Sequence, residues 1–375
     1  MSAAPAEGPE GPDAFSRALP LPFRLQLELI LGFWLWGLNL HGFWLLNIDI
    51  FSLIRYPVRP DGEGEPALHT STYRLAGVLT GIWMFAIVVF WNVTGGEAEL
   101  VIAYDWIPNV LFFAMMGVLV LPRVGIGRAL FGMRNSNGVA RLFQGLKRCS
   151  IGGIAKPKPE KFGDVLLADA LTSYSKPISE VFVTFCMFFK GLHTTNKPDR
   201  LCAHEAIVPL AIAWPFMIRL SQCLKEGQRA NALKYATAFP VIILSSIARN
   251  NPGYQFFWTL AALINSLYSF WWDVTMDWDL TLLSQTYHAQ PDKPLGLRQH
   301  RIFRLPMIYY VVIAFDLIFR FAWSMKLSLH LVYLDGIEGG IFLLEIMELV
   351  RRWVWVYFRV ETEYVRNLPG AGIDL

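Results

Sequence analysis

The chain has 375 residues, of which 54% are hydrophobic and only 17% are charged, and its mean hydropathy is +0.38. Soluble domains carry about 25% charged residues, so this composition excludes an ordinary soluble protein and predicts an all-α integral membrane protein. The net charge of +3 is small, and the sequence contains no nucleic-acid-binding signature. We therefore expect the protein to associate with the lipid bilayer and not with nucleic acid. The uneven distribution of its charges indicates the topology of the chain in the membrane.

The first 22 residues are rich in Ala, Pro, Gly and Glu and contain neither a basic start nor an apolar stretch. We expect residues 1–22 to be a disordered tail and not a signal peptide. Three apolar segments follow within residues 23–122, at about 25–50, 73–93 and 100–121. Each is long enough to cross a hydrocarbon core of roughly 30 Å.

The next stretch, residues 123–161, is a basic loop with nine Lys and Arg residues and the single acid Glu160. The positive-inside rule places this loop in the cytosol. Residues 138–149 within it alternate apolar and basic groups at helical spacing. This pattern fits either a helix on the membrane surface or a solvated loop.

Six more apolar segments complete the predicted bundle, at about 164–189, 204–224, 233–248, 254–272, 306–330 and 339–358. The expected architecture is thus a polytopic bundle of about nine transmembrane helices. Three spans before the cytosolic loop place the N-terminal tail in the lumen or outside the cell. Six spans after it place the tail at 366–375 in the cytosol.

The four cysteines form no C-x-x-C pair and have no histidine at zinc-like spacing, so we expect no metal site and no cofactor. Cys186 and Cys202 flank one short loop and would form a disulfide if that loop faces an oxidising lumen. Two separate buried thiols are the interpretation that the sequence favours.

The last apolar segment contains Glu345, Glu348, Arg351 and Arg352. A charged side chain near the centre of a spanning helix costs roughly 2.5–3.5 kcal/mol on insertion scales, so it usually faces a partner, a water-filled cavity or an ion. Adjacent residues point about 100° apart on a helix, so one partner cannot easily satisfy both arginines. This stretch predicts one part of an anion site.

Helical spacing aligns polar groups in two earlier segments. Asp169, Thr172 and Lys176 follow one another at i, i+3 and i+7, which predicts one hydrophilic helix face. Asp273 and Asp277 follow at i and i+4 and can also share a face. We expect both faces to point into the bundle.

Two further segments add to this polar interior. Lys234 and Tyr235 begin one of them, while Asp316, Arg320 and Trp323 lie at i, i+4 and i+7 in another. Trp323 would either stack on the Arg320 guanidinium or narrow a pore, and a plain lipid-facing indole is the alternative.

Four arginines, Arg219, Arg320, Arg351 and Arg352, lie too deep in their segments to be explained by snorkelling alone. Guanidinium is always charged, and its fork suits bidentate contact with phosphate or carboxylate. Four such groups would be unstable together without anions. Interhelical salt bridges remain the alternative explanation for each of them.

Support for catalysis is weaker. The acids lie in apolar segments without a nucleophile, base and orienting group in sequence, and no glycine-rich phosphate loop is present. We expect a transporter and not an enzyme.

Five ordered blocks resemble the EXS domain family. Residues 162–175 resemble its entry helix, 272–278 its W-D-x-x-x-D-W block and 320–323 its R-F-A-W block, while 348–355 and 359–363 resemble its closing elements E-x-x-R-R-x-x-W and R-x-E-x-E. Residues 39–42 also look like an early polar turn of the family. The resemblance implies an EXS-type transport core at residues 162–365.

Family members with a cytosolic SPX domain are phosphate exporters, of the retroviral-receptor and plant root-to-shoot types. This sequence shows no SPX domain, and its size and layout are closer to the fungal Golgi type that is named for defective ER retention. The resemblance implies export of inorganic phosphate from the Golgi lumen to the cytosol. Glycosylation and the retention of Golgi and ER residents would depend on it.

The resemblance also assigns residues to this path. Those matched to substrate binding are Asp169, Thr172, Arg219, Lys234, Tyr235, Asp273, Arg320, Arg351 and Arg352. Those matched to a gate or a supporting role are Trp323, Asp277 and Glu348. Thr172 stands where exporters commonly have Asn, so a hydrogen-bonding group is kept but the amide is lost.

A sorting scaffold is the alternative function. In that case a cytosolic coat adaptor would bind the basic loop or the C-terminal tail and recycle glycosyltransferases, and the charges within the membrane would be structural. A homodimer is a further partnership that we expect.

Overall fold

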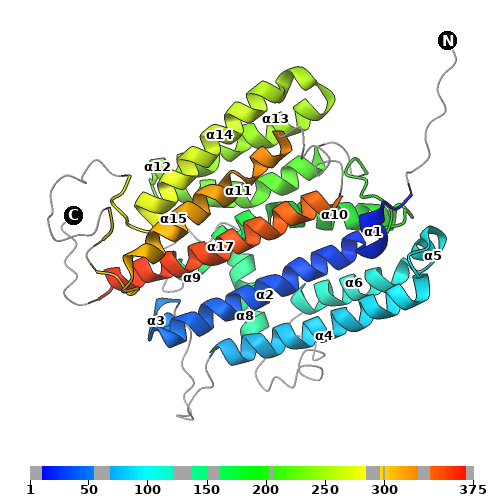
Figure 1. The fold of residues 1–375 in the computed structure, drawn as a ribbon, viewed down its shortest axis with the longest axis horizontal. Helices are drawn as coiled ribbons and strands as arrows, with labels where there is room; N and C mark the ends of the chain where they lie inside the picture. The colour runs from blue at the N-terminus through cyan, green and yellow to red at the C-terminus, as the bar shows by residue number, and fades with distance from the viewer. Residues whose placement is uncertain are drawn as a thin grey trace.

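The computed structural model describes residues 11–54, 68–120, 137–150, 161–202, 206–283, 296–298, 300–327 and 338–368. Within these ranges every regular element is a helix, which confirms the predicted all-α class. Most of the helices run along one common direction and form a bundle, whereas α8 crosses it steeply (Figure 1).

The N-terminal part of the bundle is built around a long helix, α2. Its elements are α1 (Ala14–Ala18), α2 (Leu21–Leu45), α3 (Ile50–Leu53), α4 (Leu68–Thr94), α5 (Ala98–Ala103) and α6 (Trp106–Val120). Phe23 of α2 packs edge-on against Trp83 and Phe90 of α4, with ring centroids 6.2 and 5.6 Å apart. Residues 39–42 lie inside α2, so the expected polar turn is helical instead.

Helix α8 (Asn137–Ser150) occupies the middle of the predicted basic loop. It is a regular helix, which excludes the solvated-loop interpretation of residues 138–149. Arg148 on α8 donates to both carboxylate oxygens of Asp164, on the next helix α9 (Lys161–Ser173), at 2.7 Å. Residues 123–136 and 151–160 of the same loop lie outside the described residues.

The second half contributes most of the remaining bundle. Its helices are α9 (Lys161–Ser173), α10 (Ser175–Phe189), α11 (Ile207–Lys225), α12 (Arg229–Ala236), α13 (Ala238–Asn250), α14 (Gln255–Trp272), α15 (Pro306–Arg320) and α17 (Glu338–Arg366). Shorter turns are η2 (Pro252–Tyr254), η3 (Asp273–Asp277) and η5 (Ala322–Leu327).

Two predicted segments are broken, one near its middle at Tyr174 and the other near its start at Thr237. In both cases a proline is the third residue of the helix that follows the break, at Pro177 and Pro240. Because proline has no N–H, it cannot bond to the carbonyl four residues earlier, and its ring crowds that carbonyl. The breaks at these two positions follow from this chemistry.

The turn η3 is π-helical. The Trp278 N–H donates to the Asp273 carbonyl at 2.9 Å, a bond that spans five residues. Such wide turns add a residue to a helix and often occur at functional sites.

Among the described residues, five helical stretches are long and apolar enough by themselves to cross a membrane, namely Leu68–Thr94, Ala98–Gly117, Ile207–Lys225, Arg229–Arg249 and Pro306–Ser324. They agree with a multi-pass membrane protein, while the number of about nine spans stays a prediction. Helix α1 and the end of α17 lie at opposite ends of the bundle (Figure 1), as an odd number of crossings would require.

Cys186 and Cys202 form a disulfide, with their Cα atoms 6.1 Å apart. The favoured prediction of two separate thiols is therefore wrong. Gly191 has a φ of +70°, which turns the chain back after α10, and Lys190 Nζ donates to the Cys202 carbonyl at 2.5 Å. This folded-back loop, which sequence spacing does not reveal, brings the two sulfur atoms together.

Candidate anion site

A cavity of about 230 Å³ lies within the second half of the bundle. It is lined by Asp169, Thr172, Ser175, Phe216, Lys234, Tyr235, Asn265, Ser266, Ser269, Arg320, Trp323, Glu348, Arg351 and Arg352. Four of these side chains are basic and two are acidic, and nearly all the others carry a hydroxyl, an amide or an indole N–H. Since cations outnumber acids on its wall, the cavity favours an anion.

Arg351, on α17, is held by carboxylates on several sides. Its Nη1 lies 2.9 Å from Asp316 and 3.5 Å from Asp273, and its Nη2 lies 2.6 Å from Glu348. The side chain is only 3% exposed. These acids fix the guanidinium in one orientation and offset its charge.

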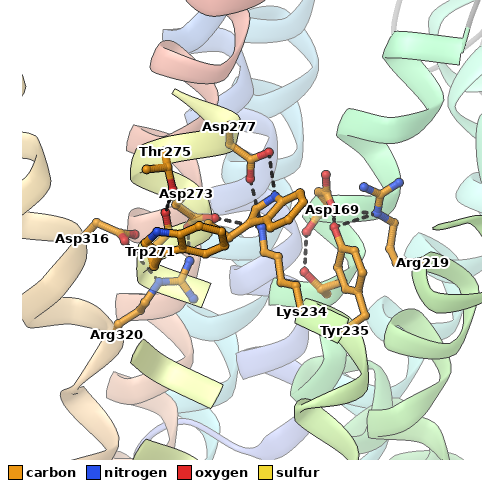
Figure 2. Close-up of polar contacts among 12 residues, drawn as sticks. Asp169, Arg219, Lys234, Tyr235, Trp271, Asp273, Thr275, Asp277, Asp316 and Arg320 are labelled. Carbon is orange, nitrogen blue, oxygen red and sulfur yellow. Dashed lines mark hydrogen bonds and ion pairs between the residues drawn. The ribbon is translucent and has the colours of Figure 1, made fainter. Parts of the chain in front are cut away.

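Lys234 and Arg320 share the fully buried Asp273, as Figure 2 shows. Lys234 Nζ lies 2.8 Å from Asp273 and 2.9 Å from Asp277. Arg320 pairs with the other oxygen of Asp273 and, at 3.1 Å, with Asp316. Both acids of η3, which follow one another at i and i+4, thus reach a single lysine on α12.

On the other side of the cavity, Asp169, Arg219 and Tyr235 form a closed triangle (Figure 2). Arg219 Nε lies 2.8 Å from Asp169 and donates to the Tyr235 hydroxyl at 2.9 Å. That hydroxyl donates to Asp169 at 2.6 Å. Asp169 and Tyr235 line the cavity, whereas Arg219 is not one of the lining residues and reaches the site through its contacts with these two. Its predicted role in substrate binding stays a prediction.

Arg352 differs from the other cations of the cavity. Its Nε donates to Ser173 Oγ at 2.9 Å and its Nη2 to Thr172 Oγ1 at 3.1 Å, and its guanidinium lies 4.6 Å from the centre of the Trp355 ring. No carboxylate of the described residues forms an ion pair with it. Neutral hydroxyls thus orient a positive charge that has no internal counter-charge in direct contact.

Trp323 follows α15 in the turn η5 and borders the cavity. Its indole N–H donates to Ser266 Oγ at 2.9 Å, and its ring packs edge-on against Trp258 with centroids 5.7 Å apart. The indole is therefore anchored to α14, and this contact takes the place of the expected stacking on Arg320.

Most of the residues predicted from the sequence come together here. Nine line the cavity, namely Asp169, Thr172, Lys234, Tyr235, Arg320, Trp323, Glu348, Arg351 and Arg352, while Arg219, Asp273 and Asp277 support them from behind. Sequence reasoning missed the lining residues Ser175, Phe216, Asn265, Ser266 and Ser269. Ser266 and Ser269 lie at i and i+3, so their shared helix face was a usable signal.

Lys176 was predicted on the same helix face as Asp169, and Glu345 in the same predicted anion-site stretch as Glu348, but neither lines the cavity. Lys176 follows the break at Tyr174, which rotates it away from the α9 face. It lies 3.8 Å from Glu345, in a second polar cluster.

The chain is similar in sequence to known proteins over most of its length. The sequence matches the EXS family over residues 19–365. It is 31% identical to Protein ERD1 homolog 1 of Schizosaccharomyces pombe, over 96% of this chain and 95% of that protein. It is 28% identical to SPX and EXS domain-containing protein 1 of Dictyostelium discoideum, over 94% of this chain and 38% of that protein, and 28% identical to Solute carrier family 53 member 1 of Homo sapiens, over 55% and 33%. The chain belongs to the EXS family.

Proposed function

We propose that this protein moves inorganic phosphate across the Golgi membrane, from the lumen to the cytosol. The observation that carries the proposal is Arg352, a guanidinium in the cavity wall that neutral hydroxyls orient and no described carboxylate pairs with. Physical reasoning from the cavity reaches an anion. The narrower identification as phosphate comes from the family's exporters.

The cavity offers groups suited to a tetrahedral oxyanion. Arg352 can present its fork to two phosphate oxygens, and Lys234 and Arg320, which line the same cavity, add positive charge. The acids Asp169 and Glu348 keep the total field weak enough for the ion to leave again. Conduction requires such a balance between entry and release.

Transport of phosphate from the lumen to the cytosol needs a driving force. An anion that enters a negatively charged cytosol moves against any such potential, so an excess of lumenal phosphate must drive it. Phosphate released when nucleotide sugars are consumed would supply that excess. The Cys186–Cys202 disulfide supports the predicted lumenal position of the loop after α10, since disulfides persist in oxidising compartments.

Phosphate flux into proteoliposomes tests the proposal. Purified full-length protein is compared with empty vesicles, using radiolabelled phosphate at a defined gradient. We expect flux well above the empty vesicles for the wild type and a strong reduction for Arg352→Ala. Wild-type flux no greater than that of empty vesicles would refute the proposal.

One observation favours the scaffold alternative, because Arg351, Arg320 and Lys234 already have internal carboxylate partners. Charges satisfied in this way can be structural. Removal of residues 366–375 separates the two functions. Loss of glycosyltransferase retention with normal phosphate flux would favour the scaffold, and loss of retention only in variants that lack flux would favour transport.

A further inference from the structure

A second polar cluster lies between α2, α10 and α17, apart from the phosphate cavity. We call it the Glu28 cluster, and its members are Arg24, Glu28, Lys176, Glu180, Arg200, Glu338 and Glu345. Neither the sequence motifs nor the proposed phosphate path assigns it a role.

Part of the Glu28 cluster is fully ion-paired. Glu338 lies 2.9 Å from Arg24 and 2.7 Å from Arg200, and Arg200 also lies 2.6 Å from Glu180. These four side chains therefore hold one another. They leave Glu28, Glu345 and Lys176 as the remaining charged members.

Glu28 lacks any such support. It is 1% exposed, and no N–H or O–H group of the described residues donates to either of its carboxylate oxygens. Glu345 is 5% exposed, and its ion pair with Lys176 is long, at 3.8 Å. The two carboxyls lie within hydrogen-bonding reach of each other. Two ionised carboxylates in such a place repel each other and are poorly solvated, so the pair is stable only if one of them is protonated.

The surrounding charges agree with a single proton. The Glu28 cluster contains four carboxyls and three cations, so one bound proton makes it neutral. The charged groups that face Glu28 are Glu345 on α17 and Glu180 and Lys176 on α10. Two neutral side chains lie on the same part of α2. The Tyr174 hydroxyl donates to the Glu28 backbone carbonyl at 3.1 Å, and the Gln26 amide donates to the Pro108 carbonyl of α6 at 3.0 Å.

The break between α9 and α10 joins the Glu28 cluster to the cavity. Ser173, just before the break, donates to Glu348 at 2.6 Å and accepts from Arg352. Lys176, just after it, pairs with Glu345. A charge change at either site therefore acts on the same four residues of backbone, and Glu345 and Glu348 are also one turn apart on α17.

We propose that Glu28 and Glu345 form a proton-binding site that is coupled to the phosphate cavity. Protonation of the pair accompanies phosphate movement and lowers the net negative charge that crosses the membrane. The coupling rests on the proposed function, whereas the proton site itself does not.

Difference infrared spectroscopy of the purified full-length protein tests the proton site. At neutral pH we expect one carboxylic-acid carbonyl band, shifted in D₂O, in the wild type and in the matched control Glu363→Gln. The band should be lost in Glu28→Gln and, as a second variant, in Glu345→Gln. The glutamine amide has an N–H donor where a protonated glutamate has an O–H donor, so both variants should fold. An unchanged band in both would overturn the site, as would stabilisation of the wild type by sodium ions with no such band.

Phosphate flux as a function of pH tests the coupling. Phosphate itself titrates near neutral pH, so the readout is the ratio of wild-type to Glu28→Gln flux. We expect this ratio to fall as pH rises, by up to about tenfold per pH unit, which is the slope of one proton. A constant ratio in transporting vesicles would overturn the coupling. No wild-type flux would refute the proposed function and leave the infrared result to decide the proton site.

Discussion

Replacement of Arg352 by alanine probes the cavity with little damage to the fold. The guanidinium makes two hydrogen bonds to neutral hydroxyls and packs on Trp355, and no described carboxylate loses an ion pair when it is removed. Each hydrogen bond to a charged group contributes about 1.5–3 kcal/mol, but loss of the guanidinium also removes the desolvation cost of a buried charge, so we expect a net loss of about 2 kcal/mol in the free energy of unfolding. The variant should therefore remain folded and suitable for binding measurements.

The same change should weaken phosphate binding strongly. A hydrogen bond to a charged partner contributes about 1.5–3 kcal/mol, and about 1.4 kcal/mol corresponds to tenfold in Kd. We therefore expect Arg352→Ala to raise the Kd for phosphate roughly 10- to 150-fold. Arg352→Lys should fall in between, because lysine keeps the charge but not the planar fork.

Isothermal titration of purified protein with phosphate at fixed salt measures this effect. The matched control is Arg359→Ala, also on α17, where the guanidinium lies 5.1 Å from the Phe162 ring centre and 3.0 Å from Glu363. We expect this control to bind phosphate like the wild type. Equal affinity of Arg352→Ala and the wild type, or equal weakening by both substitutions, would refute the reasoning.

Four further predictions follow from the described contacts. Arg351→Ala removes ion pairs to Asp273, Asp316 and Glu348, and Glu348 keeps no other ion pair among the described residues, so thermal unfolding should show a loss of about 3–5 kcal/mol, and an unchanged Tm would contradict this. Cys186→Ser removes a disulfide between residues 16 apart in sequence and should lower the free energy of unfolding by about 3 kcal/mol in chemical unfolding under oxidising conditions; an unchanged free energy would show that the bond does not form. Burial raises the pKa of Cys149 to about 12, so only about one thiol in 10⁴ is ionised at pH 8 and maleimide labelling should require unfolding; rapid native labelling would argue otherwise. Trp323→Ala removes an indole from the cavity edge and should increase phosphate flux, whereas a decrease would show that the ring does not restrict passage.

The sequence predicted the positions of the helices well because apolar length determines them. It did not predict the breaks at Tyr174 and Thr237, although Pro177 and Pro240 carried the signal. The π-helical turn at Asp273–Asp277 was also unexpected. Its acids share a partner on another helix, Lys234, and that long-range ion pair cannot be derived from local spacing.

For the site, spacing correctly indicated that Arg351 and Arg352 need different partners. It could not indicate which of them lacks a carboxylate, because Asp316 and Ser173 come from other helices. Arg219 was predicted to bind substrate, yet it is not among the residues that line the cavity and instead contacts Asp169 and Tyr235, which are. Pairings between helices decide these points, and a single sequence does not record them.

A density map of the purified protein in the presence of phosphate tests the central claim most directly. We predict density for one tetrahedral ion in the cavity, within hydrogen-bonding distance of Arg352 and facing Lys234 and Arg320, and loss of this density in Arg352→Ala. An empty cavity at a phosphate concentration that supports flux, with the ion bound elsewhere, would contradict the account.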